Sequence, residues 1–302
     1  MEGLILRSLG GFYTVISEDG TRTECRGRGI FRKDQTTLLV GDRCTFEPTE
    51  PGCGSITAIA PRKNTLQRPP VANLDRLALV ISLADPAPNA TVIDQLTAIA
   101  ARREIPVVVI FTKPDLADPA PWVEIYRKAG YPTAVVNNLT GEGLETASLL
   151  LRGGITAFCG NSGAGKSSLM NGLYPDLKLA TGEISKKLGR GRHTTRHVEL
   201  FPDGHGGWLC DTPGFSALEF SRSEPMPAAE LAECFPEMER YQDRCRYTGC
   251  SHRTEQGCAV LEAVREGLIP ESRHKSYIAI YNELKELKEW ELAKAERSRG
   301  GI

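Results

Sequence analysis

The chain has 302 residues, of which 40% are hydrophobic and 25% are charged. These are the proportions of a folded globular protein rather than of a disordered chain. The 37 Lys and Arg residues nearly balance the 38 Asp and Glu residues, and the net charge of -1 excludes a basic coat for nucleic acid but not local basic patches. No apolar run approaches the roughly 18–20 residues that span a bilayer, and the N-terminus carries no export signal. We therefore expect a cytoplasmic, monomeric protein with no membrane partner, whose 9 cysteines are reduced.

Residues 1–65 are predicted to form an OB-like β-barrel. About five short runs rich in Val, Ile, Thr and aromatic residues are separated by Gly-rich turns, a pattern typical of a small barrel. Basic residues gather in the second and third runs: Arg22, Arg26, Arg28, Arg32 and Lys33. They form either the solvated face of a strand or a platform for nucleic acid, and both interpretations stay open.

Residues 71–220 alternate between apolar runs and amphipathic segments, beginning with DRLALVISL and TVIDQLTAIAARRE. This alternation predicts a parallel sheet with helices on both faces. A polar linker over residues 62–70 precedes it. Residues 221–302 change again, to short helices, a Cys/His cluster and a long tail helix, on which Tyr277, Tyr281, Leu284 and Leu287 form a stripe that we assign to core packing. The expected domains are therefore a barrel (1–65), an α/β domain (71–220) and a helical zinc-binding domain (221–302).

A phosphate-binding loop is predicted after the apolar strand ITAFC. The residues that match G-x-x-x-x-G-K-[ST] are Gly160, Asn161, Ser162, Gly163, Ala164, Gly165, Lys166 and Ser167, followed by Ser168. Successive N–H groups of such a loop point at phosphate oxygens, and the following helix adds its positive N-terminus. Lys166 is expected to reach the β- and γ-phosphates and Ser167 to ligate Mg²⁺. The alternative, a chance Gly-rich turn, does not account for both the strand and the helix.

Two further segments fit the γ-phosphate and the metal. Asp211 and Gly214 belong to a D-x-x-G motif that ends a strand, where the carboxylate can hold Mg²⁺ through water. Between the two motifs lies a long polar loop with the sequence GRGRHTTR at 189–196. We choose Thr195 over Thr194 as the hydroxyl that completes the Mg²⁺ shell when the γ-phosphate is present. A merely basic surface loop is the alternative.

The base is predicted from Thr112, Lys113, Pro114 and Asp115, which follow the strand VVVIF and resemble the [N/T]-K-x-D guanine signature. The Asp115 carboxylate can accept two hydrogen bonds from guanine that adenine cannot offer, and the Lys113 stem can lie over the base. Thr112 replaces the commoner Asn, and Asn137-Asn138 stands where a fifth motif usually carries Ser-Ala. The guanine motif precedes the phosphate loop, which a circular permutation explains because nucleotide loops all leave the carboxyl ends of parallel strands.

A zinc site is predicted from Cys245, Cys250, His252 and Cys258, within fourteen residues. Three thiolates and one imidazole suit a closed, tetrahedral structural zinc, which also explains clustered cysteines in a reducing compartment. Buried thiols beside a surface His are the alternative. The remaining cysteines that we expect to pack as small apolar residues are Cys25, Cys44, Cys53, Cys159 and Cys210.

Together with Asn73-Leu74-Asp75, these motifs resemble the bacterial RsgA (YjeQ) family of ribosome-small-subunit-dependent GTPases over nearly the whole chain. The resemblance implies a hydrolase that converts GTP to GDP and is activated by the 30S subunit late in its maturation. It also implies a GTP/GDP switch in which the barrel and zinc domains contact 16S rRNA. The cofactors that it implies are one structural Zn²⁺ and a Mg²⁺ bound with GTP.

Phe215 stands where many GTPases place a water-orienting Gln, so we expect slow intrinsic hydrolysis. His193 is the candidate to position the water, and an RNA-facing or structural His is the alternative. Because the chain leaves the α/β domain soon after Asp211, the nucleotide state could shift the zinc domain relative to the barrel. Two other functions stay open: an RNA-binding module with a vestigial nucleotide site, against which Lys166 and Ser167 argue, and an ATP-dependent kinase or ATPase, against which Asp115 argues.

Overall fold

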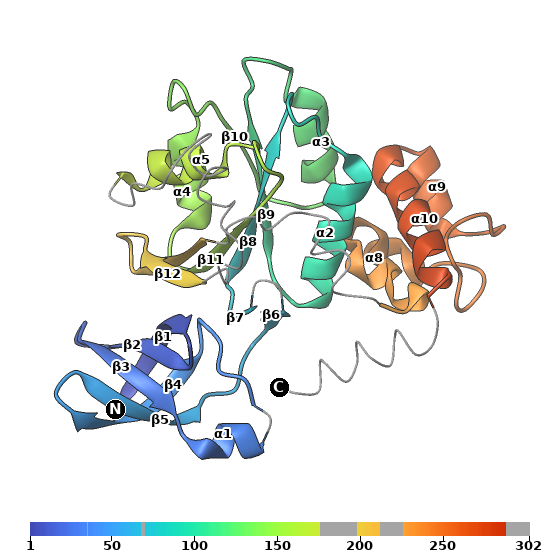
Figure 1. The fold of residues 1–302 in the computed structure, drawn as a ribbon. Helices are drawn as coiled ribbons and strands as arrows, with labels where there is room; N and C mark the ends of the chain where they lie inside the picture. The colour runs from blue at the N-terminus through green and yellow to red at the C-terminus, as the bar shows by residue number, and fades with distance from the viewer. Residues whose placement is uncertain (35, 68–69, 176–197, 212–225, 288–302) are drawn as a thin grey trace.

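The structure is a computed structural model that describes residues 1–34, 36–67, 70–175, 198–211 and 226–287. Figure 1 shows a small barrel, a central sheet flanked by helices, and a group of helices packed on one side of that sheet. None of the helices in the described ranges has the length and apolar character needed to cross a bilayer.

The N-terminal segment is a closed ring of five strands, which confirms the predicted barrel. The strands are β1 (Glu2–Leu9), β2 (Phe12–Ser17), β3 (Arg22–Gly27), β5 (Cys53–Ile59) and β4 (Arg43–Glu50), with β4 pairing back onto β1. Alternate residues face inward, so Ile5, Val15, Phe46 and Ile56 form the barrel core. A short helix, α1 (Gly29–Lys33), follows β3.

The packing predicted for the cysteines is right for four of the five. Cys25, Cys44, Cys159 and Cys210 are buried. Burial also raises the pKa of Cys159, next to the phosphate loop, to about 12, so this thiol stays protonated and unreactive. For Cys53 the prediction was wrong, because Cys53 is the first residue of β5 and lies on the outward face of the ring.

The central sheet has the order β10-β9-β8-β11-β13-β12. Its strands are β8 (Arg76–Ser82), β9 (Val107–Thr112), β10 (Thr133–Val136), β11 (Gly154–Cys159), β12 (Glu199–Pro202) and β13 (Gly207–Asp211). All are parallel except β12, which runs antiparallel to β13. The predicted parallel sheet is confirmed, with one antiparallel strand, β12, on the side next to the barrel.

Helices cover both faces of this sheet, as the alternation predicted. One face packs on α2 (Ala90–Arg102) and α3 (Ala120–Lys128), and the other on α4 (Leu144–Leu151) and α5 (Lys166–Leu173). Successive residues of β8 and β9 alternate between the two cores: Leu79 and Val109 face α2, whereas Val80 and Ile110 face α4 and α5. This double burial explains why both strands are apolar throughout.

The strand order places a topological switch point between β8 and β11. From β8 the chain adds β9 and then β10 on one side, and it then returns to β11 on the opposite side of β8. The connections at the carboxyl ends of β8 and β11 therefore diverge. In open α/β sheets the crevice at such a point is where ligands bind.

The barrel is joined to the central sheet by pairing and by buried polar contacts. β12 pairs with β1 at Glu199 and Arg7, so the strands of both parts form one continuous sheet. Two short paired strands, β6 (Thr65–Gln67) and β7 (Pro70–Ala72), lie in the segment predicted as a polar linker (62–70) and just after it. This backbone pairing, which composition does not reveal, gives the chain between the barrel and β8 a defined structure at both strands.

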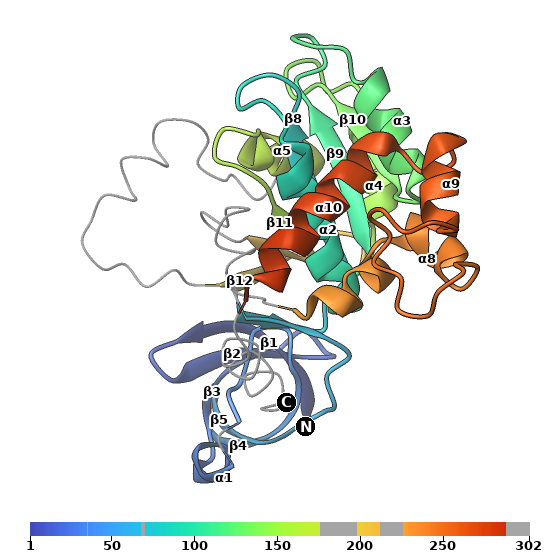
Figure 2. The ribbon, with the colours of Figure 1, turned by 90° about the vertical axis from the view of Figure 1, so that its right-hand side faces the viewer.

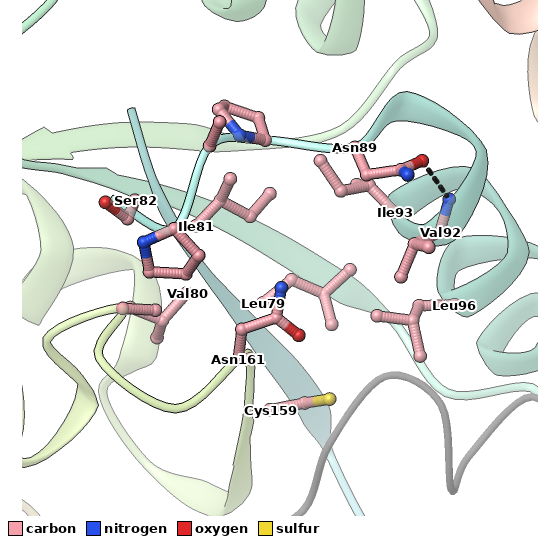
Figure 3. Close-up of a pocket in the computed structure, with 15 residues that line it drawn as sticks. Leu79, Val80, Ile81, Ser82, Asn89, Val92, Ile93, Leu96, Cys159 and Asn161 are labelled. Atoms are coloured by element: carbon pink, nitrogen blue, oxygen red, sulfur yellow. Dashed lines mark hydrogen bonds between the residues drawn. The ribbon is translucent and has the colours of Figure 1, made fainter. Parts of the chain in front are cut away.

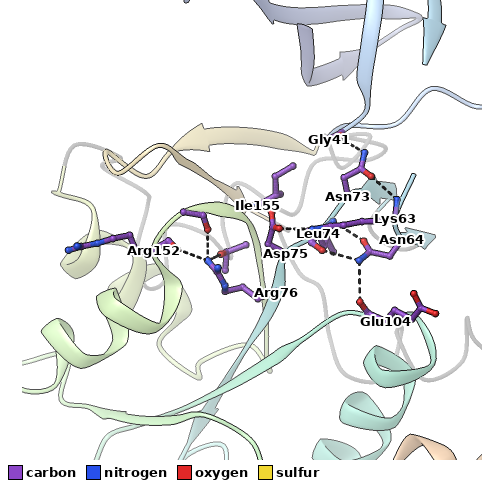
Figure 4. A network of polar contacts seen from close by, with 12 residues as sticks. Gly41, Lys63, Asn64, Asn73, Leu74, Asp75, Arg76, Glu104, Arg152 and Ile155 are labelled. Carbon is purple, nitrogen blue, oxygen red and sulfur yellow. Dashed lines mark hydrogen bonds and ion pairs between the residues drawn. The ribbon is translucent and has the colours of Figure 1, made fainter. Parts of the chain in front are cut away.

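Figure 4 shows the polar contacts at this joint. The buried Asn64 side chain donates to the Leu74 carbonyl (2.9 Å) and accepts from the Leu74 N–H (2.8 Å). Asn73, at φ 58°, donates to the Gly41 carbonyl of the barrel at 2.9 Å. The Asn73-Leu74-Asp75 motif is therefore the point at which the barrel is attached to β8.

The C-terminal helices pack on α2. They are the 3₁₀ turns η2 (Ala228–Glu230) and η3 (Ala232–Cys234), and the helices α8 (Pro236–Gln242), α9 (Ala259–Arg265) and α10 (Glu271–Lys285). Figures 1 and 2 show α10 lying beside α2. Tyr277 is 1% exposed, and Tyr281 and Leu284 pack against the same core, which confirms the predicted stripe for these three residues, whereas Leu287 lies beyond the end of α10 at Lys285.

Candidate nucleotide site and candidate metal site

A crevice opens at the switch point between the carboxyl ends of β8 and β11. Figure 3 shows Val80 to Ser82 of β8, Cys159 at the end of β11 and Asn161 in the loop after it on one side, and Val92 and Leu96 of α2 with the N-cap residue Asn89 on the other. The lining is mainly apolar, and the Asn89 side chain caps α2 by accepting from the Val92 N–H at 3.2 Å. The predicted phosphate loop thus borders a mainly apolar crevice at this edge of the sheet.

The phosphate loop has the geometry that its glycines allow. Gly163 and Gly165 adopt φ values of +82° and +87°, which L residues with side chains rarely do. Gly165 is the N-cap of α5, and Lys166 is the first residue of that helix. The Lys166 ammonium donates to the carbonyls of Gly160 (2.6 Å) and Asn161 (2.8 Å). The cation therefore lies over the loop, close to the position where phosphate would need it.

Thr112 connects the guanine motif to the phosphate loop. It is fully buried at the end of β9, and its hydroxyl donates to the Ala164 carbonyl at 2.7 Å. Lys113, at φ 61°, donates through Nζ to the Asp85 carbonyl in the loop after β8. Asp115 is exposed in the loop that follows β9. Two motifs separated by more than forty residues are thus in direct contact.

The loop after β10 adds a contact that the sequence reasoning missed. The Asn138 amide donates from Nδ2 to the Gly165 carbonyl at 3.2 Å. The sequence marked Asn137-Asn138 only as a departure from a common motif. The signal available in the sequence was an amide side chain at position 138, where the common motif has a small residue.

Several predicted residues lie outside the described residues. These are His193, Thr195 and Gly214. Asp211 ends β13, which pairs in parallel with β11, so its backbone lies on the same edge of the sheet as the phosphate loop. Its side chain is not among those described.

The four predicted metal ligands converge on one point. Their ligand atoms all lie within 4.8 Å of one another. For Zn–S bonds of about 2.3 Å and Zn–N bonds of about 2.0–2.1 Å, tetrahedral angles place sulfurs about 3.8 Å apart and sulfur about 3.6 Å from nitrogen. The Sγ atoms of Cys245 and Cys258 are 3.8 Å apart, and His252 Nδ1 lies 3.5 Å and 3.4 Å from them. These distances between ligand atoms fit a cation with tetrahedral coordination.

Electrostatics at this cluster also favour a cation. Burial lowers the pKa of His252, so the ring is neutral and able to act as a ligand. Burial, with further contributions from Cys250 and Cys245, raises the pKa of Cys258 to about 12, so a bound cation is needed to hold this ligand as a thiolate. The His274 ring contacts the His252 carbonyl at 2.8 Å, and the Tyr277 hydroxyl donates to the Ser251 carbonyl at 3.0 Å. Helix α10 therefore supports the loop that carries the ligands.

Comparison with known proteins gives one consistent result. The family described as RsgA N-terminal domain matches residues 2–56, and the family described as RsgA GTPase matches residues 59–221. A protein named small ribosomal subunit biogenesis GTPase RsgA, from Geobacillus kaustophilus, is 45% identical over 95% of this chain and 98% of its own length. Its counterpart from Moorella thermoacetica is 43% identical over 94% and 97%.

Two solved structures resemble the whole chain. YjeQ from Thermotoga maritima superposes with a TM-score of 0.80 at 32% identity, covering 95% of this chain and 99% of that one. YloQ, described as a circularly permuted GTPase, superposes with a TM-score of 0.79 at 33% identity, covering 95% and 96%.

The sheet order, the phosphate loop at its switch point and these likenesses define a circularly permuted P-loop GTPase. Within that class, the chain belongs to the RsgA family. The predicted GTP hydrolase, its fold and its family are thus confirmed.

Proposed function

We propose that this chain is a GTPase of small-subunit biogenesis, activated by the 30S ribosomal subunit late in its maturation. The observation that carries the proposal is the contact between Thr112 and the Ala164 carbonyl, because it joins a guanine motif to a phosphate loop at the switch point. The names of the relatives, small ribosomal subunit biogenesis GTPases, support the choice of partner.

In this proposal the nucleotide lies across the carboxyl ends of β9, β8 and β11. Asp115 reads guanine and the Lys113 stem lies beside the base. The phosphates lie on the loop from Gly160 to Ser168, with Lys166 at the β- and γ-phosphates. Asp211 and Gly214 approach the γ-phosphate. When bound, Mg²⁺ neutralises charge that develops on the phosphates, and Ser167 and Thr195 are its proposed ligands.

Hydrolysis is proposed to be slow without the ribosome. Phe215 offers no hydrogen bond to water, which leaves His193 as the candidate that positions it. We propose that the subunit supplies this group by acting on the 189–196 loop. Retention of full ribosome-stimulated turnover by His193→Ala would remove His193 from the mechanism.

The proposed domains are 1–65, 71–220 and 221–302, and the outer two are proposed to contact 16S rRNA. On the barrel, the Arg26 guanidinium lies over the exposed Phe12 ring, 4.3 Å from its centroid. Beside the metal site, Arg246 lies 5.4 Å from the ring of Tyr247, which is 52% exposed. Cationic groups stacked on exposed rings suit RNA phosphates and unstacked bases.

The metal at the Cys₃His cluster is proposed to be one structural Zn²⁺, bound by Cys245, Cys250, His252 and Cys258. Four protein ligands leave no position for substrate, so the ion stabilises the loop rather than reacting. Metal analysis of purified protein is expected to give about one zinc per chain, and Cys258→Ser is expected to lose it.

The deciding experiment measures GTP hydrolysis alone and with purified 30S subunits at matched salt. We expect strong stimulation by 30S in the wild type and none in Lys166→Ala, since the ammonium is lost from the phosphates. Intact GTP binding without stimulation would contradict the ribosomal activator. Absence of GTP binding would leave an RNA-binding protein with a vestigial site.

A further inference from the structure

Two residues that depart from the common guanine-nucleotide motifs, Thr112 and Asn138, lie beside the same glycine, Gly165. A Cβ placed on Gly165 would lie 2.7 Å from Asn138 Nδ2 and 3.8 Å from Thr112 Oγ1. Thr112 is shorter than the commoner Asn at its position, and Asn138 is longer than the commoner Ala at its own. The shorter side chain at position 112 is therefore accompanied by a longer side chain at position 138, in the neighbouring loop.

The loop after β10 is shaped so that Asn138 faces the phosphate loop. Asn137 Oδ1 accepts from the N–H groups of Leu139 (2.9 Å) and Thr140 (3.3 Å), which closes the turn locally. The next side chain, Asn138, is then directed away from this turn, and its Nδ2 donates to Gly165 O at 3.2 Å. The same oxygen accepts from the Leu169 N–H in the first turn of α5 at 2.8 Å.

Asn138 and Thr112 hold two consecutive carbonyls of the phosphate loop. Thr112 donates to Ala164 O, and Asn138 donates to Gly165 O. In a planar trans peptide the C=O and the following N–H point in opposite directions. Holding these two carbonyls inward therefore aims the N–H groups of Gly165 and Lys166 outward, as anion binding at a helix N-terminus requires.

The other end of the Asn138 amide is not satisfied. Its Oδ1 is buried and has no hydrogen-bond partner in the part of the chain that the structure describes. A buried amide selected for stability alone is expected to pair both ends, since an unpaired buried acceptor is unfavourable. The position of this amide is thus set by its contact with Gly165.

We propose that Asn138 is a positioning residue that ties the loop after β10 to the phosphate loop and raises affinity for nucleotides with a β-phosphate. The inference rests on the guanine-nucleotide site proposed above. It assigns a specific role to a residue that departs from the common motif, acting through the backbone of Gly165 and Lys166 rather than on the base.

The test compares wild type, Asn138→Ala and Asn138→Asp in equilibrium binding of GDP, GTP and GMP. Loss of one neutral hydrogen bond is expected to raise the Kd for GDP and GTP about 5- to 10-fold in Asn138→Ala. Asn138→Asp keeps the shape but has no donor, so its loss is expected to be at least as large. GMP has no β-phosphate, and its Kd is expected to change less than about twofold in either variant. Leu139→Ala, 86% exposed in the same loop, is the matched control.

The outcomes separate this inference from the function on which it rests. If wild type binds none of the three nucleotides, the proposed site itself fails. If wild type binds GDP and Lys166→Ala does not, while both Asn138 variants bind GDP normally, only the role of Asn138 is overturned. Wild-type affinity in Asn138→Asp with a loss in Asn138→Ala would show that shape, not donation, matters. Equal losses for GMP and GDP would place the effect on the base.

Discussion

At the scale of single residues, base choice depends on one carboxylate. Asp115 is exposed in the loop that also holds Thr112 and Lys113, so a bound base could reach it without rearrangement of the core. Asn in its place would offer one acceptor and one donor. That pattern fits xanthine, which carries an oxygen where guanine carries its amine.

We predict that Asp115→Asn weakens GTP binding about 100-fold, the effect of losing hydrogen bonds to a charged acceptor. Affinity for the xanthine nucleotide should rise, and competition binding of the two nucleotides measures both changes. Asp118→Asn is the control, since Asp118 lies three residues away and caps the Ala120 N–H that begins α3. Unchanged GTP affinity in Asp115→Asn would contradict the guanine assignment.

At the scale of elements, the Asn73-Leu74-Asp75 motif acts as a joint between the barrel and the first strands of the sheet. One oxygen of Asp75 accepts from the Ile155 N–H of β11 at 2.6 Å, and the other forms an ion pair with Lys63 at 2.5 Å. Gly154 leaves the space that this carboxylate fills. The start of β8 is thereby linked to β11 and to the chain that leaves the barrel.

This joint predicts a pH dependence. Burial by itself would raise the pKa of Asp75, but the hydrogen bonds from Lys63 and the Ile155 N–H outweigh it and lower the pKa. A carboxyl whose pKa is lower in the folded state than its unfolded value of about 3.9 stabilises the fold above that value. That stabilisation is lost as the pH falls through the lowered folded pKa.

Asp75→Asn is therefore expected to reduce stability at pH 7 by on the order of 1 kcal/mol, a modest figure because the carboxylate is partly exposed. The difference from wild type should shrink below about pH 4. Denaturant unfolding at pH 7, 5, 4 and 3 measures it. Asp243→Asn, at an exposed position, is the control. A difference that stays constant with pH would show that the lost carboxylate charge is not the cause.

At the scale of the whole molecule, a buried ionic cluster holds the C-terminal helices to the central sheet. Arg273 of α10 donates to Asp94 of α2 and to Glu237 of α8, at 2.6 Å in each case. All three side chains are at most 2% exposed. Burial would lower the pKa of Arg273, but the two carboxylates outweigh it and raise the pKa well above the usual value. Tyr126 completes the cluster by donating to Asp94 at 2.8 Å.

This cluster bears on the expected motion of the zinc domain. Because the Arg273 guanidinium of α10 is buried against Asp94 of α2, the helices around the metal site should move together with α2. The barrel is held to the rest by contacts of another kind: the pairing of β12 with β1, an ion pair of Arg7 with Glu199 at 3.8 Å, and the neutral or partly exposed contacts of the Asn73-Leu74-Asp75 joint. A shift driven by nucleotide state is thus expected between the barrel and the rest of the molecule.

Arg273→Met is predicted to destabilise the packing of α10 by about 3–5 kcal/mol, because it leaves two buried carboxylates without a cation. Native-state hydrogen exchange of the α10 amides reports this local loss. Lys275→Met is the control on the same helix, since Lys275 pairs with Glu271 in solvent and such pairs contribute about 0–1 kcal/mol. Equal protection in both variants would contradict the role of the cluster.

The sequence alone determined the features that depend on local pattern. The phosphate loop, its strand and its helix are contiguous in the chain, and the four metal ligands lie within fourteen residues. The spacing of these residues along the chain is therefore enough to predict both sites. Alternating apolar runs identified a sheet covered on both faces. The zinc-type geometry and the sheet order then agreed with these predictions.

Only the tertiary structure decided which distant residues meet. Thr112 and Ala164 are 52 residues apart, and Arg273 and Asp94 are 179 apart. Nothing in the local pattern around Arg273 distinguishes it from a solvated charge, yet its side chain is buried. A buried charge is unfavourable unless partners from other elements surround it. Such partners leave no periodic signal in either segment, because they are brought together only when the sheet and the helices pack.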